Sequence, residues 1–92
     1  MTTSPITIRV READGDVLLD AQALAIAFGV EVTAVRALPI VDGASRIPRE
    51  WARRGKRRAR EAMAHTGSDA LVDALRYWAR QDHDAELFVV YE

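Results

Sequence analysis

Alternation of apolar and polar residues at the two ends of the chain predicts a small β-sheet. Residues 6–10, ITIRV, alternate in the manner of a half-buried strand. Asp14-Gly15 suits a two-residue hairpin turn, and DVLL (16–19) would form the returning strand. At the other end, AELFVVYE (85–92) is rich in β-formers and predicts a last strand. Because an isolated strand leaves its backbone groups unpaired, we expect one mixed or antiparallel sheet that joins both ends.

Helical spacing of apolar residues between these strands predicts four helices. Asp20 suits the N-cap of the first helix and Gly29 its end, Pro39 ends the second helix, Gly67 ends the third, and Ser68 caps the fourth. The helices are predicted over residues 21–28, 32–38, 47–65 and 69–81. The core face of the last helix is predicted to hold Leu71, Val72, Leu75, Trp78 and Ala79. With helices covering one face of the sheet, we expect a single α+β domain over residues 1–92.

The composition excludes several classes of function. No run of 18 apolar residues exists, so no membrane span is expected, and the first residues lack the apolar stretch of a signal peptide. The chain has no cysteine, which excludes thiolate chemistry and fits a cytoplasmic location. His65 and His83 have no neighbours at metal-ligand spacing. Without a glycine-rich phosphate loop or a nucleophile beside a base, we expect no enzyme, no metal and no cofactor.

Positive charge is concentrated in one part of the chain. The net charge is −1, yet eight of the sixteen residues in RIPREWARRGKRRARE (46–61) are Arg or Lys. On a wheel at about 100° per residue, the third helix is amphipathic. Its apolar arc is predicted to hold Trp51, Ala52, Gly55, Ala59, Ala62 and Met63. The remaining arc holds Arg53, Arg54, Lys56, Arg57, Arg58 and Arg60. Because the apolar arc is mostly Ala and Gly, it offers little to insert into a membrane.

This uniform face favours a negatively charged partner. Like charges four residues apart repel by a few tenths of a kcal/mol per pair, and a polyanion or an acidic protein would relieve that repulsion. The other interpretation is that acidic residues elsewhere in the chain neutralise the face internally. The residues available for that role include Asp69, Asp73, Asp82 and Asp84.

The most specific pattern of the chain lies in residues 21–38, AQALAIAFGVEVTAVRAL. Ala25 is small enough to let a second helix cross close to the first, Gly29 can turn the chain at positive φ, and Val35 follows six residues later. The apolar positions around them are Leu24, Phe28, Val30 and Leu38. Such a set packs between two helices that are joined by a short turn. Two Ala-rich helices that meet at a glycine also occur in many other folds. The stretch resembles the helix-turn-helix of bacterial DNA-binding proteins.

The resemblance extends to the next helix. A short Gly-containing segment followed by RIPREW (46–51) is similar to the wing and the following helix of excisionase-like and MerR-like winged domains, so that the resemblance covers residues 21–51. Two positions depart from the pattern. Glu31 stands where Ser or Thr usually caps the second helix, and Asp42 brings negative charge to the segment that corresponds to the wing.

Two hypotheses of function follow. In the first, the chain is a small DNA-binding protein, a transcriptional regulator or a recombination or phage accessory factor, that binds as a dimer. The resemblance then implies that Thr33 and Arg36 read base edges, with Arg36 preferring guanine. The residues expected to contact phosphates are Arg46, Arg49, Arg53, Arg54, Lys56, Arg57 and Arg60. In the second, the basic helix docks on an acidic protein surface, as an adaptor or inhibitor would. In either case the edge of the last strand could pair with another chain.

Overall fold

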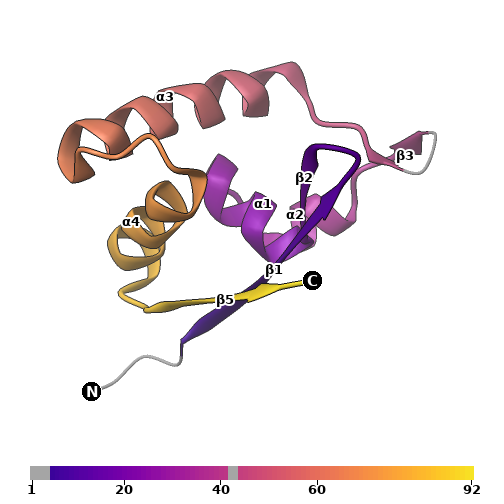
Figure 1. Cartoon of the computed structure of the whole chain (residues 1–92). Coiled ribbons are helices and arrows are strands. Elements are labelled where there is room, and N and C mark those ends of the chain that lie inside the picture. The colour runs from indigo at the N-terminus through magenta and orange to yellow at the C-terminus, as the bar shows by residue number, and fades with distance from the viewer. Residues whose placement is uncertain (1–4, 42–43) are drawn as a thin grey trace.

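The two ends of the chain meet in one three-stranded sheet. The computed structural model describes residues 5–41 and 44–92. Strand β1 (Ile6–Ala13) lies between β2 (Asp16–Leu19) and β5 (Leu87–Tyr91) (Figure 1). It pairs with β2 in antiparallel and with β5 in parallel orientation, so the sheet is mixed. The predicted α+β fold, with a sheet that joins both ends, is confirmed.

A tight turn connects the first two strands. Asp14 and Gly15 both have positive φ, at 53° and 81°. Two consecutive residues of positive φ are the mark of a type I′ turn, whose twist matches that of the strands it joins. The turn sets the register in which Val10 pairs with Leu19. The hairpin predicted from Asp14-Gly15 is therefore present. Strand β1 is longer than the predicted 6–10 and continues to Ala13.

Four helices and a short hairpin separate β2 from β5. These elements are α1 (Ala21–Phe28), α2 (Val32–Arg36), β3 (Ile40–Val41), β4 (Ala44–Ser45), α3 (Arg49–Thr66) and α4 (Leu71–His83). Asp20 caps α1 as predicted, because its side chain accepts a hydrogen bond from the Ala23 N–H at 2.9 Å. Gly67 ends α3 in the left-handed conformation, which also agrees with the sequence.

The start of α4 differs from the prediction. The helix begins at Leu71, two residues later than expected, and its N-cap residue is Ala70, which has no side chain able to cap. Ser68 is not the cap, because its hydroxyl donates to the Asp73 carboxylate at 2.7 Å and accepts from the Ala70 N–H at 3.1 Å. The serine thus stabilises the turn before the helix rather than the first turn of the helix itself.

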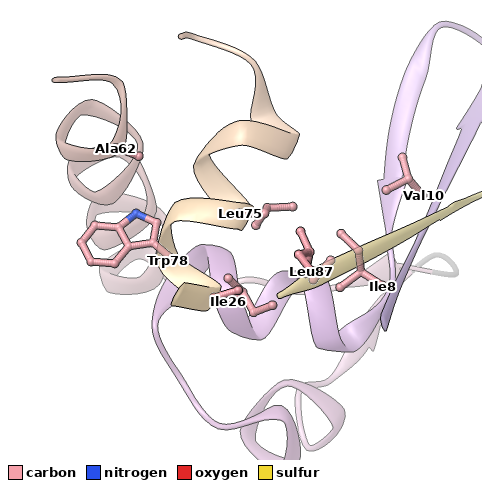
Figure 2. Packing of buried hydrophobic residues seen from close by; sticks show 9 residues of the cluster. Ile8, Val10, Ile26, Ala62, Leu75, Trp78 and Leu87 are labelled. Carbon is pink, nitrogen blue, oxygen red and sulfur yellow. The ribbon is translucent and has the colours of Figure 1, made fainter. Parts of the chain in front are cut away.

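Helices α1 and α4 pack on one face of the sheet, and α3 packs on these two helices. Ile8 of β1, Ile26 of α1 and Leu75 of α4 are almost fully buried, and Figure 2 shows them converging with Leu87 of β5. Such burial contributes about 1.5–3 kcal/mol for each large aliphatic side chain. Leu71, which was expected in the core, is 42% exposed because it lies in the first turn of α4, at the margin of this cluster.

Candidate nucleic-acid interface

The buried face of α3 is rotated by roughly 50° about the helix axis from the expected one, although Trp51, Gly55 and Ala62 belong to both. Its least exposed positions are Trp51, Gly55, Arg58 and Ala62, which recur at intervals of four and three residues. Trp51 packs on Phe28 with 6.0 Å between ring centroids, and a Cβ at Gly55 would lie 3.0 Å from the same Phe28 ring. The face that meets α1 is therefore the one centred on these four residues. Three residues assigned to the apolar arc are exposed instead, namely Ala52, Ala59 and Met63.

Arg58 is the main correction to the helical wheel. The wheel placed it among the solvated charges, but its side chain is only 14% exposed. Its guanidinium donates from Nη2 to the Ile26 carbonyl at 2.7 Å and from Nε to the Ala27 carbonyl at 3.3 Å. These carbonyls belong to the last turn of α1, where the regular i+4 hydrogen bonds end and the macrodipole attracts a cation. The Ile26 carbonyl also accepts from the Gly29 N–H at 3.3 Å. Arg58 thus holds α3 against the end of α1.

Helix α4 completes the surroundings of Arg58. Nη2 also pairs with the Asp82 carboxylate at 2.7 Å, and the guanidinium lies 4.0 Å from the centroid of the Trp78 ring. In return, the Trp78 indole N–H donates to the Arg58 carbonyl at 3.0 Å. One arginine therefore connects three helices through hydrogen bonds, an ion pair and a cation–π contact.

Gly29 is required by the same arrangement. It ends α1 with a φ of 69°, and the Val30 N–H returns to the Ala25 carbonyl at 3.0 Å. This left-handed conformation favours glycine. A Cβ at this position would also lie 2.7 Å from the Arg58 guanidinium. The glycine that turns the chain from α1 into α2 therefore also makes room for Arg58.

The opposite side of α3 carries a row of positive charge that we call the basic stripe. At about 100° per residue, its members fall within roughly 100° of arc, opposite the buried face. The basic stripe consists of Arg49, Arg53, Lys56, Arg57 and Arg60, all exposed. The last four of them line a shallow groove of about 330 Å³. The helix thus separates its buried arginine from five solvated cations.

The basic stripe has no acidic partner among the described residues. Over residues 5–41 and 44–92 the ion pairs are Arg9 with Glu92 and Arg58 with Asp82. Of the acidic residues proposed to neutralise the helix, Asp82 pairs with the buried arginine instead, and Asp73 accepts from Ser68. Internal neutralisation of the basic stripe is therefore not found in the described part of the chain.

Arg54 belongs to a different part of the helix surface. On the wheel it lies on the flank, near the positions of Glu50 and Glu61. An acidic residue four positions before an arginine favours a local pairing of a few tenths of a kcal/mol. Arg54, although expected among the phosphate contacts, thus sits in a mixed-charge environment outside the basic stripe.

The α1–α2 pair and the following hairpin form a second group of predicted site residues. Thr33 and Arg36 are exposed on α2, while Val35 is buried. Glu31 is the N-cap residue of α2 and makes no side-chain capping bond, as expected of glutamate at this position. Strands β3 and β4 follow as a two-stranded antiparallel ribbon, and the N–H of exposed Arg46 donates to the Pro39 carbonyl at 2.8 Å at its base. Asp42 lies outside the described residues.

The two groups lie on two different helices that neighbour α1. Both α2 and α3 pack against α1 (Figure 1). Because the basic stripe lies opposite the face of α3 that meets α1, it points away from α1. The structure therefore brings the α3 cations together in one row, but it does not bring Arg36 or Thr33 into that row. The helical wheel could identify the row of cations on α3. The position of α2 relative to that row depends on packing alone.

Comparison of the chain with models of protein families, with curated proteins and with solved structures finds no match in any of the three. Within the described residues, no group of three or more His, Cys, Asp or Glu side chains could hold a metal ion. No helix there is long and apolar enough to cross a membrane. The geometry of the basic stripe and of the α1–α2 pair is therefore the basis for a functional proposal.

Proposed function

We propose that this protein is located in the cytoplasm and binds double-stranded DNA there, as a small regulator or recombination accessory factor. The observation that carries the proposal is the basic stripe, five exposed cations in one row with no acidic partner among the described residues. Arg58 supports it, because this partly buried arginine attaches α3 to α1 and α4 without using any residue of the basic stripe. The cations of the stripe remain available for phosphates.

The α1–α2 pair supports recognition of a specific DNA sequence within the same proposal. Two short helices joined by a left-handed glycine, followed by a two-stranded ribbon and a long helix, correspond in order to a helix-turn-helix and wing. Arg36 would then read guanine in the major groove, with Thr33 beside it, and Arg46 would contact the backbone near the ribbon. Because these residues belong to α2 and to the base of the ribbon, outside α3, their contribution can be measured with variants that leave the basic stripe unchanged.

Salt dependence provides the first test. If each of the five residues of the basic stripe contacts one phosphate, counterion release predicts a log–log slope of about −4.5. Affinity for a duplex would then fall roughly 500-fold between 50 and 200 mM salt. Fluorescence anisotropy with a labelled duplex of about 25 base pairs measures this, since that length exceeds the size of a single module's site.

Poly-glutamate serves as the matched competitor in that titration, because it carries negative charge without the phosphate geometry of a duplex. DNA binding that poly-glutamate displaces only weakly would agree with the proposal. Absence of duplex binding at 50 mM salt would overturn it. Tight binding to poly-glutamate under those conditions would instead favour the acidic-protein hypothesis.

Arg36→Ala provides the second test. If α2 enters the major groove, selection from a random duplex library yields a preferred sequence with a guanine that Arg36 contacts. The variant should lose about 1–3 kcal/mol of discrimination at that base and keep its affinity for unrelated DNA. Arg11→Ala, which removes an exposed arginine on the sheet, is the control and should leave the preference intact. An unchanged sequence preference in Arg36→Ala would contradict the proposal that α2 contacts bases in the major groove.

A further inference from the structure

Strand β5 has an open edge whose backbone groups are free to pair. The Ile6 N–H donates to the Glu86 carbonyl, and the Glu92 N–H donates to the Val10 carbonyl, each at 2.9 Å. Since N–H and C=O groups alternate in direction along a strand, the even-numbered residues of β5 turn toward β1. Leu87, Val89 and Tyr91 therefore present their N–H and C=O groups to the outer edge. No strand covers that edge within the described part of the chain.

The same strand carries a concentration of exposed apolar side chains. Phe88 is 53% exposed, Val90 is 42% exposed and Tyr91 is 69% exposed. Because Leu87 is buried beneath the helices, alternation places Phe88 and Val90 on the opposite, uncovered face of the sheet. Tyr91 lies on the helix-covered face but beyond the core. An exposed edge strand with such side chains is suited to pairing with another strand.

A groove runs beside this edge. It has a volume of about 850 Å³ and is lined on one side by α4 residues, including Arg76, Tyr77 and Arg80, and on the other by residues 85–89. Tyr77 is held in place by stacking on His65, with 5.1 Å between ring centroids. The groove therefore has both the volume and the aromatic lining, at Tyr77, to receive a side chain from an added strand.

We propose that the occupant of this edge is a second copy of the chain, paired antiparallel through β5 about a two-fold axis at Val89. This register joins Leu87 to Tyr91 of the second copy and Val89 to Val89 of the second copy. All the outward N–H and C=O groups of the three edge residues are then satisfied. The result is a continuous six-stranded sheet across the two copies.

One register accounts for the exposed side chains as well. Phe88 faces Val90 of the second copy in a non-hydrogen-bonded pair, which brings side chains closest together. Tyr91 of the second copy lies opposite Leu87 on the helix-covered face, where its ring enters the groove beside Tyr77, Arg76 and Arg80. An unrelated peptide could pair with the edge, but a second copy of β5 supplies both the apolar pair and the tyrosine in this one register.

The register also contains one unfavourable pair. Glu86 lies opposite Glu92 of the second copy, and like charges directly opposite in a sheet are destabilising. The Arg9–Glu92 ion pair, at 3.1 Å, partly offsets this repulsion. Glu86→Lys replaces it with an attractive pair and should tighten the dimer, an effect that general hydrophobic association would not produce.

Sedimentation equilibrium of the full chain tests the proposal without DNA, so that its failure is separate from failure of DNA binding. We expect the mass to approach twice the 10.2 kDa of one chain as concentration rises. Phe88→Lys and Tyr91→Lys should each weaken dimerisation at least about 10-fold, and Glu86→Lys should strengthen it by about 3-fold. Leu18→Lys is the matched control, because Leu18 is equally exposed on the other edge strand, and should have no effect.

The register has its own test because the wild-type chain has no cysteine. An equimolar mixture of Phe88→Cys and Val90→Cys chains should form an oxidised heterodimer with a disulfide between positions 88 and 90, since the Cα atoms of a non-hydrogen-bonded pair lie about 4.5 Å apart. Leu18→Cys mixed with Val90→Cys should not. A chain that stays monomeric at about 300 µM, or a dimer that survives both lysine variants, would overturn the proposal.

Discussion

Replacement of Arg58 by alanine is expected to lower the free energy of unfolding by about 3 kcal/mol. The side chain makes three charge-assisted hydrogen bonds, to two carbonyls of α1 and to Asp82, and it stacks on Trp78. Hydrogen bonds to charged groups contribute about 1.5–3 kcal/mol each, and part of that gain offsets the desolvation of the guanidinium. For a domain of this size the midpoint of thermal unfolding should fall by roughly 12–24 °C.

Arg57→Ala is the matched control for this prediction. It removes the same side chain one position earlier in the helix, but Arg57 is exposed on the basic stripe and makes no hydrogen bond within the described residues. Its effect on stability should lie within about 0.5 kcal/mol. Thermal and urea unfolding followed by circular dichroism measure both variants. Equal losses in the two would show that Arg58 does not connect the three helices.

Arg58→Lys refines the expectation. Lysine keeps the positive charge near Asp82 and the α1 carbonyls, but it lacks the planar group that stacks on Trp78 and donates in two directions. We expect a loss between those of wild type and Arg58→Ala, about 1–2 kcal/mol. A lysine variant as stable as wild type would mean that charge alone, rather than the geometry of the guanidinium, holds α3 in place.

Reversal of charge within the basic stripe is expected to abolish most of the proposed DNA affinity. The double variant Arg53→Glu/Arg57→Glu removes two neighbouring cations of the basic stripe and replaces them with carboxylates. Loss of two charge-assisted phosphate contacts, at about 1.5–3 kcal/mol each, lowers affinity roughly 100-fold or more. The salt slope should become shallower by about 2, because two fewer counterions are released. Fluorescence anisotropy at several salt concentrations measures both quantities.

The control for this variant carries the same change of net charge at other exposed positions. Arg11→Glu/Arg54→Glu alters one arginine of the sheet and one on the flank of α3. If position rather than total charge decides binding, the control should retain affinity within about 5-fold at 150 mM salt, where the Debye length is about 8 Å. Equal losses of DNA affinity in the two double variants would show that the net charge of the protein, rather than the position of the basic stripe, determines binding. Circular dichroism confirms that each variant is folded.

The two predictions assign different tasks to adjacent arginines. Arg57 and Arg58 are neighbours in the sequence and belong to the same residue type, yet one faces solvent and the other is surrounded by α1 and α4. Stability and binding should therefore separate cleanly: loss of Arg58 affects unfolding, and loss of the basic stripe affects association with a polyanion. This separation also means that binding defects in variants of the basic stripe can be interpreted without a folding defect.

Local features of the fold were predictable from the sequence because neighbouring residues cause them. The Asp14-Gly15 turn, the Asp20 cap and the ends of α1 and α3 at Gly29 and Gly67 depend on backbone preferences that act over a few residues. The pairing of the two chain ends followed from the need of each strand for a partner. The row of cations on α3 followed from helical periodicity.

Other features were beyond local reasoning. Ser68 resembled a cap, but its hydroxyl is occupied by Asp73 and Ala70, so α4 begins later. A helical wheel sorts residues by polarity, and it therefore placed Arg58 in solvent. Only packing puts the last carbonyls of α1, the Asp82 carboxylate and the Trp78 ring around that one guanidinium. Its polar group is satisfied there, which makes burial favourable.

The sequence by itself determined the four helices and the three strands of the sheet, several of the turns and caps that bound them, and that positive charge gathers on one helix. The tertiary structure decided that β5 runs parallel to β1, that no strand of the described residues covers its outer edge, and that Arg58 is enclosed by α1 and α4. The physical reason is the range of the interactions. Turns, caps and helical periodicity act within a few residues, whereas strand orientation and helix packing depend on contacts between residues far apart in the chain.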